Sequence, residues 1–158
     1  MNKKHIILII LFIQGIFVFA TVQLPDVLIY NGRQYMIWEE PMEYYFNQFP
    51  EKRPQWRSTN LWRCYIATFE IIQNELWVID IKDSNNVSII NDVLNGNDRM
   101  KIDWYNGIIG LFIDNRHDRR VGSYAYIFYT VLEINNGHFQ NEIIMNERQY
   151  FELRRQRR

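Results

Sequence analysis

Few residues of this chain have side chains suited to catalysis or ligand binding, and the most reactive of them is the only cysteine, Cys64. Cys64 lies in the stretch "WRCYIATFEI", Trp62 to Ile71, which is typical of a strand. A thiol becomes nucleophilic when a nearby histidine or helix N-terminus lowers its pKa, and a strand interior supplies neither. A leftover cysteine in an exported protein can also link two chains. We favour a third interpretation, burial as a small hydrophobic side chain, because free cysteine is among the most buried residue types.

The most polar cluster is "DNRHDRR", Asp114 to Arg120, with His117 between two carboxylates and three arginines. A metal site would need further ligands converging from elsewhere in the chain. A solvated loop between two strands is the favoured interpretation, and His117 stays a candidate binding residue.

Glu39, Glu40 and Glu70 raise the possibility of glycoside hydrolysis, which uses two carboxyl groups roughly 5 to 9 Å apart in a cleft lined by aromatic rings. Aromatic side chains are available, and Trp104 is a candidate binding residue among them. Aromatic residues at strand spacing are more often core residues, however, and a short chain leaves little room for a cleft. The tryptophans are Trp38, Trp56, Trp62, Trp77 and Trp104.

Arg63 and Glu70 are the charged candidates within the predicted strand 62–73. They are seven residues apart, so they lie on opposite faces of that strand. An unpaired buried charge is costly, so whichever of the two points inward must have a partner. It then marks either a binding site or a structural ion pair.

The segment "MNKKHIILIILFIQGIFVFA", residues 1–20, has the plan of a signal peptide. Lys3 and Lys4 precede an apolar run that ends in small residues, and we predict cleavage after Ala20. The run falls short of the roughly 20 residues that span a membrane, so no membrane span is expected after cleavage. The expected location is periplasmic or extracellular.

Residues 21–158 form a single predicted domain of 138 residues, with 16 basic and 18 acidic side chains once Lys3 and Lys4 are removed. This near-neutral balance argues against nucleic acid as a partner. One cysteine excludes an internal disulfide. No phosphate-binding glycine loop, C-x-x-C, H-E-x-x-H or G-x-S-x-G motif is present, and no cofactor is predicted.

Turn signals between alternating runs dominate the chain. Asn31-Gly32 and Asn136-Gly137 are strong hairpin signals, and Asn74-Glu75 is a weaker one. Gly110, inside a further strand, suggests a bulge or the close approach of another backbone. Seven strands are predicted, at 27–30, 33–38, 62–73, 76–82, 106–114, 124–135 and 138–145.

Helical spacing is confined to short pieces near 41–48, 84–95 and 147–154, the last opened by Asn146 and Gln149 as a capping box. The predicted fold is mainly β with small helices, an antiparallel meander forming a barrel or sandwich. Both faces of several strands are partly apolar, which indicates that helices cover them or that the sheet curls around a cavity.

Four stretches resemble a family of small, exported, functionally uncharacterised bacterial proteins. They are "PDVLIYNGRQYMIWEEPMEYYF", "WRCYIATFEI" with "LWVIDI", "DWYNGIIGLFI" and "YAYIFYTVLEINNG". The chain departs from the family pattern at Cys64, where a small residue such as glycine is expected, and at Phe69, where a second aromatic residue, usually tryptophan, is expected. The resemblance implies a β-rich fold and an extracytoplasmic location, and it implies no activity.

Two classes of function follow from the sequence. The first is a non-enzymatic protein-binding module of the cell envelope, comparable to an immunity or inhibitor protein. The second is a lipocalin-like carrier of a small ligand, because mixed strand faces can enclose a cavity. A small hydrolase is the third alternative.

Overall fold

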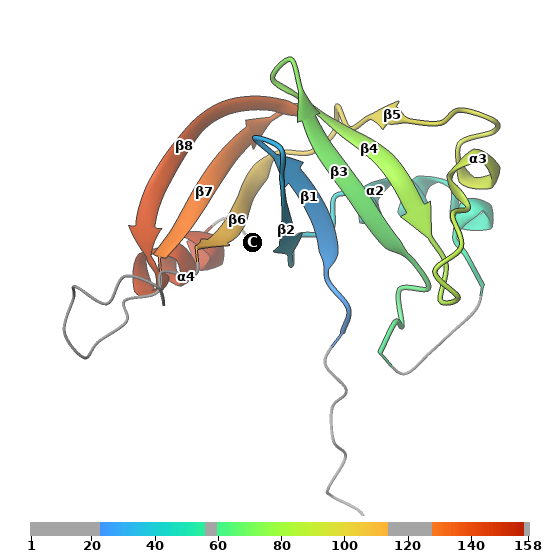
Figure 1. Cartoon of the computed structure of the whole chain (residues 1–158), viewed down its shortest axis with the longest axis horizontal. Coiled ribbons are helices and arrows are strands. Elements are labelled where there is room, and N and C mark those ends of the chain that lie inside the picture. The colour runs from blue at the N-terminus through green and yellow to red at the C-terminus, as the bar shows by residue number, and fades with distance from the viewer. Residues whose placement is uncertain (1–22, 56–59, 114–127, 157–158) are drawn as a thin grey trace, which may run out of the picture.

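The computed structural model describes residues 23–55, 60–113 and 128–156. The predicted signal segment, Trp56 and His117 lie outside these residues. None of the described helices is long and apolar enough to cross a membrane. The elements, shown in Figure 1, are β1 (Asp26–Tyr30), β2 (Arg33–Ile37), α2 (Glu43–Gln48), the 3-10 turn η1 (Pro50–Lys52), β3 (Ile66–Ile72), β4 (Glu75–Lys82), α3 (Ile90–Val93), β5 (Met100–Lys101), β6 (Gly107–Ile113), β7 (Phe128–Asn135), β8 (His138–Asn146) and α4 (Glu147–Gln156).

The eight strands form one open, mixed sheet in the order β2-β1-β3-β4-β8-β7-β6, with β5 paired to β4. The prediction of a mainly β fold is confirmed. The antiparallel barrel or sandwich is wrong, because β1 and β3 are parallel and the end strands β2 and β6 touch without pairing. The connection from β2 through α2 takes the chain to the other side of β1, where β3 enters the sheet parallel to β1.

The sheet consists of two groups of strands that meet at a narrow joint. Figure 1 shows β7 and β8 arching over to the turn between β3 and β4. There Leu76 N donates to the carbonyl of Gly137 (2.8 Å), and Phe139 N donates to the carbonyl of Asn74 (2.8 Å). Gly137 N donates in turn to the carbonyl of Tyr105 (2.9 Å). The turn at Asn136 and Gly137 therefore holds the two halves of the sheet together.

The hairpin turns follow the sequence signals closely. Asn31-Gly32 and Asn136-Gly137 both adopt left-handed conformations, with φ of 50° and 72° in the first turn and 47° and 71° in the second. The third turn is Gln73-Asn74, with φ of 52° and 65°, one residue earlier than predicted. Asn tolerates positive φ better than most residues, so the turn takes Asn74 into its second central position and leaves Glu75 to start β4.

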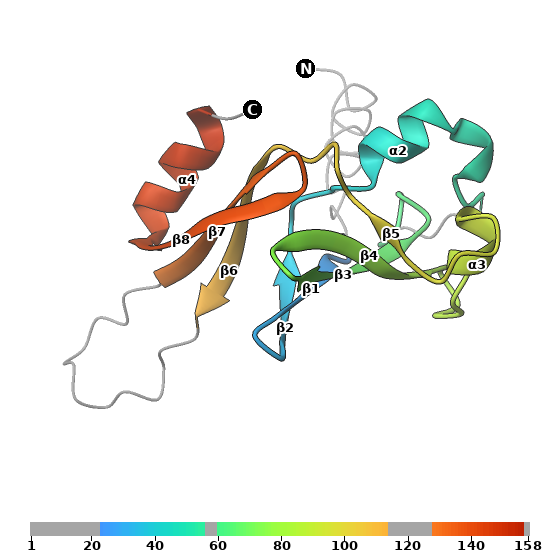
Figure 2. The ribbon, with the colours of Figure 1, turned by 90° about the horizontal axis from the view of Figure 1, so that it is seen from above.

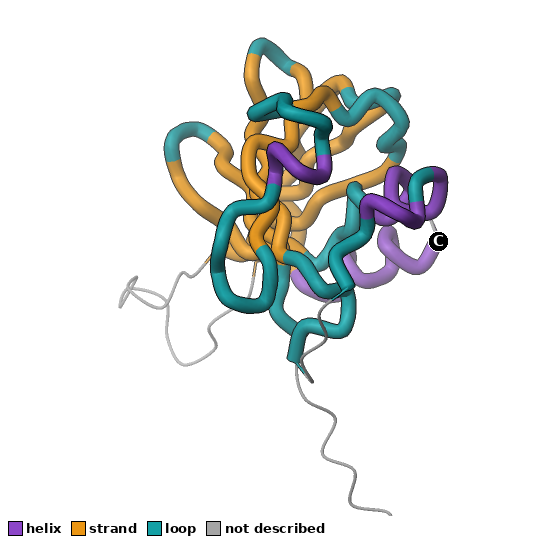
Figure 3. The backbone as a smooth tube through the Cα atoms, turned by 90° about the vertical axis from the view of Figure 1, so that its right-hand side faces the viewer, coloured by secondary structure: helices purple, strands orange, loops and turns teal. Residues whose placement is uncertain are grey.

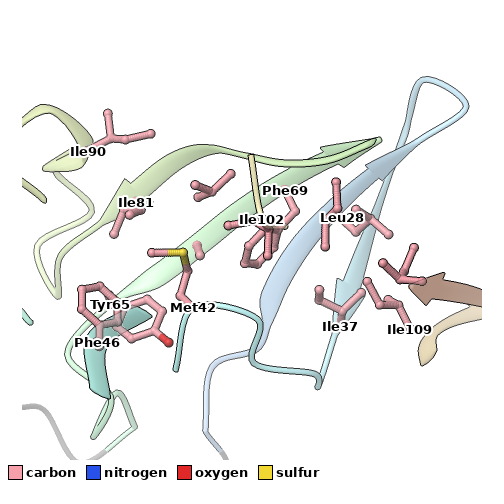
Figure 4. Packing of buried hydrophobic residues seen from close by; sticks show 14 of the residues in the cluster. Leu28, Ile37, Met42, Phe46, Tyr65, Phe69, Ile81, Ile90, Ile102 and Ile109 are labelled. Atoms are coloured by element: carbon pink, nitrogen blue, oxygen red, sulfur yellow. The ribbon is translucent and has the colours of Figure 1, made fainter. Parts of the chain in front are cut away.

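The main core lies between the inner face of the sheet and the helices α2 and α3 (Figure 4). Leu28, Phe69 and Ile109 are fully buried contributions from β1, β3 and β6. In β4 both Val78 and Ile81 are buried, although they are an odd number of residues apart. A β-bulge opposite Thr68 and Phe69 inserts a residue and so changes which face the strand presents. This bulge explains why both faces of the hairpin looked mixed in the sequence.

A second, smaller core lies on the outer face of β6 and β7, where α4 packs. Asn146 and Gln149 form the predicted capping box through two backbone-to-side-chain hydrogen bonds of 3.0 Å each. Tyr150 is buried and lies against Gly110, where an added Cβ would come within 2.4 Å of the ring. The register of β6 is regular at Gly110, so the glycine makes room for a side chain rather than for a bulge or a backbone. Helix α4 thus covers the second apolar face of this half.

Two predicted elements are shorter than expected. The strand predicted at 62–73 begins only at Ile66, because a tight turn precedes it. The helix predicted at 84–95 is reduced to α3, because the Asp83 carboxylate accepts hydrogen bonds from the amides of Asn85 (2.9 Å) and Val87 (3.0 Å). Such local bonds to an aspartate compete with helix formation. The two-residue strand β5 carried no signal of its own.

Candidate functional site

Glu70 lies at the centre of an uncovered sheet face. It points outward from β3, because its neighbour Phe69 is fully buried on the inner side. The register places Ile29 of β1 beside it on one side and Trp77 of β4 on the other. Two residues earlier along β1, Val27 lies between Met36 of β2 and Thr68 of β3. We call this surface the open face; its outward residues are Val27, Ile29, Gln34, Met36, Thr68, Glu70 and Trp77.

No described helix covers the open face, although Met36 is the only one of its apolar side chains that is strongly exposed and the indole nitrogen of Trp77 is enclosed. Its apolar members belong to neither core cluster, and Met36 is 69% exposed. Figure 2 shows α2 above the strands, α4 beside β7 and β8, and no helix beneath β1 and β2, and in Figure 3 the helices, in purple, lie in front of the strands and to their right but not to their left. The guanidinium of Arg99 lies 5.3 Å from the ring of Trp77. Within the described part of the chain, Glu70 makes no hydrogen bond or ion pair.

Arg63 belongs to the turn before β3, where it is buried in an ion pair. Its Nη1 donates to Asp26 Oδ2 (2.9 Å), and its Nη2 donates to the carbonyl of Leu24 (2.9 Å). The amide of Ala67 donates to the other oxygen of Asp26 (2.9 Å). The ring of Tyr65 lies 5.2 Å from the guanidinium. These contacts are those of a structural ion pair that fixes the start of β1 against the start of β3.

Burial governs the protonation of Asp26, which is 0% exposed. Loss of hydration raises its pKa to about 6, and the opposing effects of Arg63 and of the Ala67 amide only partly offset that rise. Glu43, near the same cluster, behaves differently. Burial alone would raise its pKa, but hydrogen bonds from Arg53 and Tyr65 outweigh that effect and lower it.

Trp104 is an anchor between α2 and the segment that leads into β6. Its indole Nε1 donates to the carbonyl of Pro41 (2.8 Å), and its ring stacks on Tyr44 and Tyr45, with centroids 5.9 and 6.0 Å away. The contacts are internal to the fold. Trp104 and Glu70 therefore do not come together in one site, and His117 lies outside the described residues.

Cys64 occupies a turn and not a strand interior. Its φ is 72°, in the left-handed region, and it is only 4% exposed. Its sulfur lies 3.4 Å from the carbonyl of Trp62. This burial supports the interpretation of Cys64 as a filling side chain. The positive φ also gives a physical reason why glycine would suit this position.

We expect Cys64→Gly to be more stable than Cys64→Ala, although glycine is the smaller residue. Alanine loses the sulfur contacts and keeps the left-handed strain, which costs about 1 kcal/mol or more, whereas glycine removes that strain. Urea unfolding of the two variants measures the difference. An alanine variant as stable as the glycine variant would show that the backbone at position 64 is not strained.

A pocket of about 280 Å³ lies where three distant segments meet. The chain after β2 supplies Trp38, Glu39 and Glu40, the segment entering β6 supplies one wall, and α4 supplies Arg154. We call it the Glu39 pocket; its remaining lining residues are Tyr105, Asn106, Gly107 and Ile108. Trp38 is 49% exposed and stands at its edge.

Glu39 is buried in this pocket with one oxygen bonded and one oxygen without a partner. Tyr150 donates its hydroxyl to Oε1 (2.8 Å), and Arg154 Nε lies 3.8 Å from the same oxygen. Oε2 is buried and has no hydrogen-bond partner among the described residues. Burial raises the pKa of Glu39, and the Tyr150 hydrogen bond and the charge of Arg154 only partly offset that rise. Glu39, which keeps one enclosed carboxylate oxygen without a hydrogen bond, thus belongs to the lining of the pocket.

The lining of the Glu39 pocket carries charges of both signs, two carboxylates and the guanidinium of Arg154. Glu40, which is half-exposed, lies 3.7 Å from Arg63 Nε, while Glu39 faces Arg154. Sequence reasoning singled out Glu39 and Glu40 only as a carboxylate pair for hydrolysis and did not associate them with Arg154. No periodic pattern connects residues that are more than a hundred positions apart.

Among the described residues, no three histidine, cysteine or carboxylate side chains are grouped so that they could hold a metal ion. The sequence matches no protein-family model, no curated protein and no solved structure.

Proposed function

We propose that this protein is an exported, non-enzymatic binding module that docks a partner protein of the cell envelope through the open face. The observation that carries the proposal is a sheet face on which apolar side chains surround an unpaired carboxylate and over which no described helix lies. Export rests on the signal-peptide pattern of residues 1–20. An immunity-like or inhibitor-like role agrees with such a docking surface.

The charge of Glu70 specifies what the partner must present. Burying Glu70 in an interface without a counter-charge would leave an unpaired ion, which is strongly unfavourable. A partner that covers the open face must therefore place a lysine or arginine opposite Glu70. Apolar side chains around that cation would pack on Ile29, Met36 and Trp77. Aromatic residues and methionine are enriched in the buried centres of such interfaces.

The mixed strand faces that suggested a small-ligand carrier have a different explanation in this structure. Helix α4 covers the outer face of β6 and β7, and the open face accounts for the apolar outer side of β1 and β3. The inner face is occupied by packed core side chains. Docking of a protein makes use of the surface that remains.

Site-specific cross-linking in the cell tests the proposal. A photoreactive amino acid replaces Met36 in one variant and Trp62 in a control variant, because both side chains are 69% exposed and Trp62 is not part of the open face. We expect one defined partner to be cross-linked from position 36 and not from position 62. Glu70→Lys in the same chain should abolish that product. Equal cross-linking from both positions, or a product unaffected by Glu70→Lys, would contradict docking through the open face.

A further inference from the structure

We infer that the Glu39 pocket is a binding site for a neutral sugar unit, separate from the open face. The inference starts from Glu39 Oε2, a buried acceptor without a hydrogen-bond partner. A buried polar atom that makes no hydrogen bond is rare in folded proteins and destabilises them. A ligand that donates a hydrogen bond at this point would remove that cost.

The charges of the pocket select the kind of donor. Each carboxylate in the lining has a guanidinium within 4 Å, Arg154 for Glu39 and Arg63 for Glu40. A cation would be attracted by the carboxylates but repelled by Arg154. An anion would be attracted by Arg154 but repelled by the carboxylates. A hydroxyl group both donates and accepts hydrogen bonds without carrying charge. It is therefore matched to a lining that offers carboxylate acceptors and guanidinium donors together.

Other polar groups of the lining are already engaged and only shape the pocket. The Tyr105 hydroxyl donates to the carbonyl of Ile108 (3.0 Å). The Asn106 side chain donates to Trp104 O and Asn136 Oδ1 (3.2 Å each) and accepts from the amide of Asn136 (2.8 Å). The polar side chains that can still bind a ligand, and so determine which ligand fits, are therefore Glu39, Glu40 and Arg154.

Trp38 supplies the apolar part of the site. Its indole is half-exposed at the edge of the pocket, where a ring can stack on it. Arg154 is held by one hydrogen bond to the carbonyl of Trp38 (3.2 Å) and by its longer contact with Glu39. Because Oε2 is enclosed in the structure, we expect sugar binding to displace the Arg154 side chain from Glu39 and so open the carboxylate to a ligand hydroxyl. The pocket volume of about 280 Å³ is at the lower end of ligand sites, which agrees with one sugar ring rather than a long chain.

Titration of the full-length protein with single sugars tests the inference. Glucose, galactose and N-acetylglucosamine are added separately while the indole N–H resonance of Trp38, assigned by its loss in Trp38→Ala, is followed by NMR. We expect at least one sugar to give a saturable shift, with a Kd of about 1 mM or below. Butylamine and inorganic phosphate, as a cation and an anion, should give none.

Three variants complete the test. Trp38→Ala, in which binding is followed through the backbone amide resonance of the lining residue Gly107 because the indole signal is lost, should weaken sugar binding about tenfold, since a stacked aromatic ring contributes roughly that factor. Glu39→Gln should weaken it similarly by changing the acceptor, and Trp62→Ala should leave it unchanged. If Glu39→Gln does not fold, the comparison of Trp38→Ala with Trp62→Ala decides. The absence of saturable shifts with every sugar, sugar binding unchanged in Trp38→Ala, or tighter binding of butylamine or phosphate would overturn the inference.

Discussion

Replacing Gly137 with alanine is expected to lower the free energy of unfolding by about 3 kcal/mol or more, which is severe for a single methyl group. Gly137 has a φ of 71°, and a Cβ at this position would lie 2.1 Å from the carbonyl oxygen of Ile102. Because the obstructing atom belongs to the backbone, no side-chain rotation can relieve the overlap. The turn would have to move away from the joint between the two halves of the sheet.

Gly32→Ala is the matched control for that variant. Gly32 also follows an asparagine in a hairpin turn, with a φ of 72°, but a Cβ there would meet no atom within 4 Å. Its expected cost is the left-handed strain alone, about 1 to 2 kcal/mol. Urea unfolding measures both variants. Hydrogen exchange at the amides of Leu76 and Phe139 should also accelerate in Gly137→Ala. Equal losses of stability in the two variants would show that the joint does not depend on close approach.

The second large effect concerns the buried ion pair. Arg63→Met leaves Asp26 buried without its counter-charge, and we expect a loss of about 3 to 5 kcal/mol near pH 8. The loss should shrink on acidification. In the native protein the pKa of Asp26 is about 6, above its ordinary value of 3.8, so its protonated form stabilises the folded state below about pH 4, and this contribution is lost as the pH rises through 6.

Without Arg63 the pKa of Asp26 should rise further, because the guanidinium charge normally lowers it. Protonation then neutralises Asp26 already in mild acid. Urea unfolding measures the difference in the free energy of unfolding between the native protein and Arg63→Met. That difference should be about 1 to 2 kcal/mol smaller near pH 5 than near pH 8.

Arg53→Met is the control for the Arg63 experiment. Arg53 pairs with Glu43 at a distance of 2.7 Å, and both side chains are partly exposed. Such pairs contribute about 1 kcal/mol or less. The pKa of Glu43 is lowered, so the contribution of this pair is lost only as the pH falls below the ordinary range of glutamate. Between pH 5 and 8 the cost of Arg53→Met should stay constant. A pH-independent loss in Arg63→Met would contradict the protonation of Asp26.

The parts of the fold that were predictable from the sequence depend on local backbone chemistry. Asn31-Gly32 and Asn136-Gly137 mark their turns because both central residues need positive φ. Asn146 and Gln149 mark the start of α4 because the capping box consists of residues three apart. The parallel pairing of β1 with β3 has no local signal. It depends on where the crossover through α2 delivers the chain.

The candidate sites were less predictable, because they depend on contacts between distant segments that carry no local sequence signal. Glu70 was identified as a charge within a strand, but the absence of a described helix over it is a property of the tertiary structure. Arg63 was correctly expected to need a partner if it pointed inward, yet nothing in the sequence identified Asp26 as that partner. The Glu39 pocket requires Tyr150 and Arg154, which reach Glu39 only because α4 packs on β6 and β7.

A charge-swap measurement tests docking through the open face most directly. Once the partner cross-linked from position 36 is known, its basic residue opposite Glu70 is changed to glutamate, and Kd values are measured for the four combinations with native protein and Glu70→Lys. We expect each single change to weaken binding and the double change to restore it, with a coupling of about 1.5 kcal/mol or more. Losses that simply add in the double variant would contradict a central role for Glu70 and, with it, docking through the open face.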